Sequence, residues 1–74
     1  MASASNKLAR LTPRETAVLG RVAQGDTNLQ IANALFVSPT TVRRHLEHIF
    51  EKLEVRNRAA AASVYVSGLD STSP

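Results

Sequence analysis

Three residues, Phe36-Val37-Ser38, constrain the fold of this chain more than any other part of its sequence. Apolar residues at helical spacing precede them, and a second helical pattern begins directly after them at Pro39. Serine followed by proline is typical of a helix start, because the hydroxyl caps the first turn and proline fits the first helical position. Two helices joined by so short a turn must cross at a steep angle, which predicts a helix-turn-helix.

An earlier helix is predicted by the same kind of signal. Thr12 and Pro13 mark its start, and Glu15 completes a capping box with Thr12. We expect this helix to end at Gly25, which adopts the left-handed conformation easily. Its apolar positions at helical spacing are Val18, Leu19, Val22 and Ala23.

The two helices around the short turn have distinct apolar faces. The second helix starts after Asp26 and Thr27, and its buried positions are Ile31, Ala32 and Leu35. The third spans 39–53, with a single apolar stripe at Val42, Leu46, Ile49 and Leu53. Phe36 and Phe50 are interpreted as core aromatics.

A fourth helix completes the predicted domain. Asn57 caps it, it spans 58–67, and Gly68 closes it. The fold class is therefore all-α, a compact four-helix domain that contains a helix-turn-helix and leaves the fourth helix available for dimerisation. The domain is expected to cover 10–69, with 1–9 as a flexible tail or linker and 70–74 as a second flexible tail.

Composition excludes several classes of function. With 74 residues the chain allows one small domain, which can hardly wall a substrate pocket, so no enzyme and no catalytic residue are predicted. There is no cysteine for a disulfide or a thiolate metal site, and no apolar run long enough to span a bilayer. A cytosolic protein is expected. The net charge of +3 suggests an anionic partner.

The charges of the third helix are sorted along its length. Arg43 and Arg44 lie in its N-terminal half, whereas Glu51 and Glu54 lie in its C-terminal half. The helix dipole favours the opposite order, so helix stability does not explain the pattern. It suits a helix whose N-terminal residues enter a DNA major groove. The alternative is a solvated face on which Arg43 pairs with Glu47 one turn away.

Taken together, these residues resemble the LuxR-type helix-turn-helix, the DNA-binding domain of LuxR-, NarL- and FixJ-like bacterial transcription regulators. The resemblance covers about residues 8–69 and is carried by Leu11-Thr12-Pro13-Arg14-Glu15, Val18-Leu19, Val22-Ala23-Gln24-Gly25, Asn28, Ile31-Ala32, Leu35, Ser38, Thr41-Val42, His45, Ile49, Lys52-Leu53, Val55 and Arg58. It implies sequence-specific binding of double-stranded DNA, in the bacterial cytoplasm, by the output domain of a response regulator or ligand-sensing regulator.

Site residues follow from the resemblance position by position. The base-reading positions fall on Arg43, Arg44 and Glu47, where arginine suits guanine and glutamate suits cytosine. The expected phosphate contacts are Asn28, Thr40, Thr41, His45, Lys52, Arg56 and Arg58. The chain departs from the family at Leu29-Gln30, where Lys-Glu is common, and at Glu47, which is often basic or small.

The fourth helix carries a second stripe of small residues, at Ala59, Ala62, Ser63 and Val66. The family dimerises through this helix, so a weak homodimer, assisted by DNA, is expected here. The alternative is that these small residues reflect only the high helix propensity of an alanine run.

Other functions remain open at the level of sequence. The helix-turn-helix could serve mainly protein contact, including contact with RNA polymerase, or dimerisation alone. His45, His48 and Glu51 share one helix, but their spacing is loose and a fourth ligand is not evident, so no metal and no cofactor are predicted.

Overall fold

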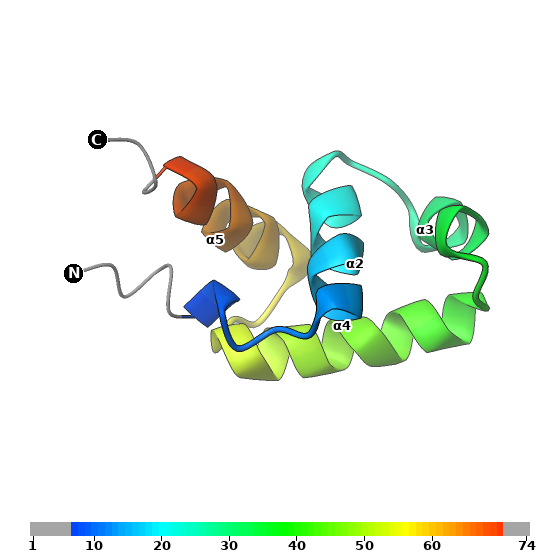
Figure 1. The fold of residues 1–74 in the computed structure, drawn as a ribbon, viewed down its shortest axis with the longest axis horizontal. Helices are drawn as coiled ribbons and strands as arrows, with labels where there is room; N and C mark the ends of the chain where they lie inside the picture. The colour runs from blue at the N-terminus through cyan, green and yellow to red at the C-terminus, as the bar shows by residue number, and fades with distance from the viewer. Residues whose placement is uncertain (1–6, 71–74) are drawn as a thin grey trace.

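The computed structural model describes residues 7–70, which form four helices of eight residues or more. These are α2 (Pro13–Ala23), α3 (Asn28–Leu35), α4 (Pro39–Leu53) and α5 (Arg58–Asp70), and these residues contain no strand. The all-α fold and the helix-turn-helix, formed by α3 and α4, are confirmed. In Figure 1, α4 lies along one edge of the molecule, α2 stands over its middle, and α3 and α5 lie toward its two ends.

The helix starts follow the capping signals of the sequence. At α2 the Thr12 hydroxyl accepts the Glu15 amide at 3.1 Å, and the Glu15 carboxylate accepts the Thr12 amide at 2.9 Å. Ser38 caps α4 ahead of Pro39, and the Asn57 side chain accepts the Ala60 amide at 2.8 Å at the start of α5. Local bonds of this kind satisfy amides that have no partner within the helix.

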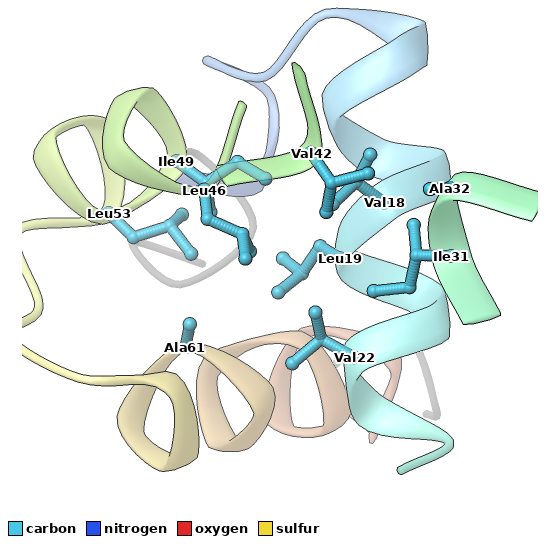
Figure 2. Close-up of a cluster of buried hydrophobic side chains, with 10 residues drawn as sticks. All are labelled: Val18, Leu19, Val22, Ile31, Ala32, Val42, Leu46, Ile49, Leu53 and Ala61. Carbon is cyan, nitrogen blue, oxygen red and sulfur yellow. The ribbon is translucent and has the colours of Figure 1, made fainter. Parts of the chain in front are cut away.

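One hydrophobic core joins all four helices (Figure 2). Its buried members are Val18, Leu19 and Val22 from α2, Ile31 and Ala32 from α3, Val42, Leu46, Ile49 and Leu53 from α4, and Ala61 from α5. The apolar stripe predicted for α4 is therefore buried along its whole length. Burying that stripe fixes which side of α4 faces outward, because the remaining positions of the helix must lie on the opposite face.

The C-terminal helix is longer than the sequence predicts. α5 continues through Gly68 to Asp70, so Gly68 does not close it and Asp70 does not begin a tail. Gly68 is buried, and a Cβ atom there would overlap the Leu8 side chain. Glycine at this position therefore serves a close approach between the N-terminal segment and α5. Leu8, assigned to the tail by its sequence, packs against the core.

The prediction that Phe36 is a core aromatic is wrong. Phe36 is 93% exposed, because it is the left-handed C-cap residue of α3 and faces away from the core. Phe50, in contrast, is half-buried and packs against the core as predicted. The predicted tail residues 1–6 and 71–74 lie outside the described residues.

Candidate nucleic-acid interface

The N-terminal half of α4 presents an open polar face. Arg43, Arg44 and Glu47 are all exposed, because Val42 and Leu46 turn the opposite side of the helix into the core. Figure 1 shows α2, α3 and α5 on one side of α4, so none of them covers its outer edge. The three side chains predicted to read bases are thus brought together on one accessible surface.

These charged groups have no partner among residues 7–70. Neither guanidinium group makes a hydrogen bond or ion pair there, and the pairing of Arg43 with Glu47 considered from the sequence does not form. The neighbouring helix offers no alternative partner, because α3 carries no charged residue. The donors of both arginines are therefore available to an acceptor outside the chain.

The polar residues at the start of α4 divide between capping and exposure. The Thr41 amide donates to the Ser38 hydroxyl at 3.1 Å, and the two hydroxyl groups lie 3.0 Å apart. Thr41 is half-buried, as is His45 one turn later, whereas Thr40 is exposed. Thr40 is thus the most accessible of the three predicted phosphate contacts on this part of the helix.

The C-terminal half of α4 is tied to the start of α2. The Lys52 ammonium donates to the Glu15 carboxylate at 2.7 Å, and the His48 Nδ1 atom lies 4.0 Å from the other carboxylate oxygen. The Glu15 side chain is 5% exposed, whereas that of Lys52 is 34% exposed. Glu15 is thus a buried carboxylate that serves two helices, as the cap of α2 and as the partner of α4.

The charge state of Glu15 follows from these contacts. Burial raises the pKa of this carboxyl, but the hydrogen bonds from Lys52 and the Thr12 amide, the charge of Lys52 and the nearby His48 ring together outweigh it. The net result is a pKa below the ordinary value for glutamate. Glu15 is therefore ionised at neutral pH, and Lys52 keeps its counter-charge.

Asn28 and Arg58, both predicted phosphate contacts, lie in direct contact. One Arg58 nitrogen donates to the Asn28 side-chain oxygen at 2.7 Å, and the other donates to the Asp26 carbonyl. The Asp26 carboxylate also accepts from Arg21 at 3.0 Å. Arg58 therefore fastens the start of α5 to the start of α3. Arg56, the remaining predicted cationic contact, is exposed and has no partner within residues 7–70.

Two further arginines matter that the sequence interpretation does not single out. Arg10 donates to the Lys52 carbonyl at 3.2 Å and to the Glu54 carboxylate at 3.1 Å, at the C-terminal end of α4. Arg14 donates to the Leu35 carbonyl at the end of α3, at 3.3 Å. Arg10 precedes the capping box of α2 and Arg14 lies within it, and that box is the one signal in the sequence that marks this region.

The small-residue stripe of α5 is only partly exposed. Ala59, Ser63 and Val66 are exposed, whereas Ala62 is half-buried and packs against the core.

In the part of the chain that the structure describes, no three His, Asp or Glu side chains could together hold a metal ion. Nor is any described helix long and apolar enough to cross a membrane.

Known proteins are similar to this chain in sequence. The sequence pattern of the family described as "Bacterial regulatory proteins, luxR family" matches residues 9–65. A probable transcriptional regulatory protein, SgaR of Hyphomicrobium methylovorum, is 47% identical over 60 residues, which cover 81% of this chain and 28% of that protein. The nitrate/nitrite response regulator protein NarP of Escherichia coli is 45% identical over 56 residues, 76% of this chain and 26% of its own length.

A third relative is the CsgBAC operon transcriptional regulatory protein of Escherichia coli, 42% identical over 59 residues, 80% of this chain and 27% of that protein. The chain thus spans about a quarter of the length of these curated relatives. No solved structure matches it significantly.

Proposed function

Because the chain belongs to the LuxR family of bacterial regulatory proteins, we propose that it binds double-stranded DNA through the N-terminal half of α4 and so controls transcription. The LuxR-type domain is a DNA-binding domain, and its relatives are named as transcriptional regulators rather than as enzymes. The observation that carries the proposal is the pair of exposed arginines at positions 43 and 44, neither of which has a partner within residues 7–70.

In this proposal, α4 lies in the major groove with its N-terminal end toward the bases. Arg43 and Arg44 donate to guanine O6 and N7, and Glu47 accepts from the cytosine amino group. Thr40, Thr41, His45 and Arg56 contact phosphates around this end of the domain. Glu51 lies further along α4, exposed and without an ion-pair partner among residues 7–70, where the helix rises away from the phosphates.

Three predicted phosphate contacts have a second task in the folded domain. Lys52 neutralises Glu15, and Asn28 accepts from Arg58. An ammonium group has three donors, so Lys52 can bind Glu15 and a phosphate together. We therefore keep Asn28, Lys52 and Arg58 in the proposed contact set, with weaker individual effects than those of unpartnered side chains.

The wider context is proposed from the relatives. Response regulators and other transcriptional regulators among them are about four times longer than this chain, so we infer that the domain is the output part of such a regulator in the bacterial cytoplasm. A weak homodimer through Ala59, Ala62, Ser63 and Val66 of α5 would place two copies of α4 on two half-sites. Contact with RNA polymerase would then serve activation.

The proposed function is tested by selecting bound duplexes from a random pool. The selected duplex and a scrambled duplex are then titrated at several salt concentrations. We expect preference for the selected duplex and an affinity that falls steeply with salt, because phosphate contacts release counterions. Failure to enrich any sequence, or an affinity independent of salt, would contradict it.

The proposed dimer has its own test. Val66→Glu places a charge on the exposed stripe of α5, and we expect it to reduce self-association on a duplex with two half-sites. The free energy of unfolding should stay within about 0.5 kcal/mol of that of wild type. Ala17→Glu, which places the same charge at an exposed position on α2, is the matched control. A Val66→Glu variant that assembles as well as the control would contradict the dimer.

A further inference from the structure

Two large hydrophobic side chains on the outward side of α3 are left uncovered by the fold. Leu29 is 61% exposed and Phe36 is 93% exposed, and the exposed Asn33 lies between them. Leu29 and Asn33 lie one turn apart on α3, and Phe36 follows directly after the helix as its C-cap; all three are exposed, whereas Ile31 and Ala32 are buried. We call Leu29, Asn33 and Phe36 the α3 face. Of the large exposed hydrophobic residues in the described chain, the only other one is Val66.

Nothing inside the domain accounts for phenylalanine at position 36. Its backbone is left-handed, with φ of 60° and ψ of 44°, a conformation in which glycine or asparagine is favoured over a bulky residue. Its ring also packs against no core residue. A phenylalanine at this position is disfavoured by its left-handed backbone and by the exposure of its ring to water. This combination indicates a contact outside the domain.

The charges around the α3 face favour a second copy of this chain as that contact. The stretch from Thr27 to Val42 contains no Asp, Glu, Lys or Arg, whereas the whole chain carries a net charge of +3. Two copies of a positively charged chain repel one another, and a surface without charges is where that repulsion is least. A strongly acidic or basic partner would find no complementary group on α3.

The size of the α3 face indicates when the contact forms. A stable interface in solution buries about 800 Å² on each partner, far more than one leucine and one phenylalanine side chain supply. Two copies would therefore not pair through this face on their own. Binding side by side on one DNA molecule raises their effective concentration, which allows so small a contact to form.

The position of the α3 face is compatible with simultaneous DNA binding. In Figure 1, α3 and α5 lie at opposite ends of the molecule, and the outer edge of α4 is free of both. Resting on the proposed DNA-binding function, we propose that the α3 face joins copies bound to neighbouring sites, so that the chain occupies tandem sites cooperatively. The surface of α5 remains available for pairing within one site.

The test uses duplexes that carry one selected site or two tandem sites at spacings varied in single base pairs over one helical turn. We expect wild type to bind the second site at least about fivefold more tightly than a lone site at one phase of spacing. Phe36→Gly should abolish that gain, while the affinity for a lone site stays within about twofold. Because glycine suits the left-handed backbone, the variant should fold at least as well as wild type.

Two further variants sharpen the result. Leu29→Gln should reduce the gain in the same way as Phe36→Gly. Ala17→Gln alters an exposed position of α2, outside the α3 face, and should leave the coupling between tandem sites unchanged. Absence of coupling in wild type at every spacing, or full coupling in Phe36→Gly, would overturn the proposal, and a different partner would then cover the α3 face.

A loss of lone-site affinity in Phe36→Gly equal to the loss on tandem sites would also overturn it, because the ring would then contact DNA. Failure of wild type to bind a lone site is a separate result. That outcome would refute the proposed function itself, and it is visible before any tandem duplex is used.

Discussion

The two halves of α4 contain similar residues in opposite circumstances. In the N-terminal half, Arg43, Arg44 and Glu47 are exposed and have no partner among residues 7–70. In the C-terminal half, Lys52 binds the buried Glu15 of α2, and its carbonyl accepts from Arg10. One half offers its charges to a ligand, whereas the other uses Lys52 to fasten the helix to the domain and leaves Glu51 exposed.

The helices that pack on each half explain this difference. α3, which packs on α4 and leads into its start, is uncharged and so provides no carboxylate for Arg43 or Arg44. The start of α2 carries Glu15, which the capping box holds in place. A residue type therefore does not reveal its task, because the task depends on which helix lies opposite. We call these regions the free half and the tied half of α4.

Glu15→Ala should give the largest effect on stability, and it tests the tied half. We expect the free energy of unfolding to fall by about 2–3 kcal/mol, because the Thr12 amide and the Lys52 ammonium both lose their partner. Since Lys52 is partly exposed, solvent screening keeps the loss toward the lower figure. Chemical denaturation measures it. Glu47→Ala in the free half is the control and should change the free energy of unfolding by less than about 0.5 kcal/mol. Equal losses of stability in the two variants would contradict the difference between the two halves.

Replacement of Arg43 or Arg44 by alanine tests the free half. Each should weaken binding to the selected duplex by about 1–3 kcal/mol, because a forked pair of donors to guanine is lost. Stability should stay within about 0.5 kcal/mol of wild type. Lysine at the same position keeps the charge without the fork, so it should restore binding to the scrambled duplex more than to the selected one. Alanine variants that bind the selected duplex like wild type would mean that the free half does not read DNA.

The smallest predicted effect is a pH dependence confined to the tied half. Because the pKa of Glu15 is lowered on folding, the ionised carboxylate stabilises the domain above its unfolded pKa of about 4.3, and this stabilisation disappears as the pH falls through the folded pKa. The stability difference between wild type and Glu15→Gln should therefore shrink as the pH is lowered below about 4.3. Denaturation at each pH measures it, and a constant difference would contradict the assignment.

The sequence predicts the local parts of this structure well. The Thr12–Glu15 box, the Ser38 cap and the Asn57 cap each join residues three positions apart, so they depend on a single turn of chain. The buried stripe of α4 follows from periodicity in the same way. These features are enough to place the helices and to orient the free half of α4.

Contacts between distant residues could not be predicted from one sequence. Glu15 and Lys52 are 37 positions apart, and Asn28 and Arg58 are 30 apart, so both pairs depend on how the helices cross. Gly68 resembled a helix terminator, but its lack of a side chain serves the close approach of Leu8. Phe36 resembled a core residue, but its place in the turn directs it outward.

Loss of two positive charges from each of two regions provides the most direct test of the central claim. The first variant carries Arg43→Gln and Arg44→Gln in the free half. The second carries Arg10→Gln and Arg56→Gln, which remove the same charge from exposed positions elsewhere. The affinity of each is measured for the selected and the scrambled duplex at one salt concentration.

We predict that the first variant loses at least about tenfold of the preference for the selected duplex, since base contacts supply that preference. The second should lose affinity for both duplexes alike and keep the wild-type preference. Equal preference in the two variants, or a larger loss of preference in the second, would contradict the assignment of DNA reading to the free half of α4.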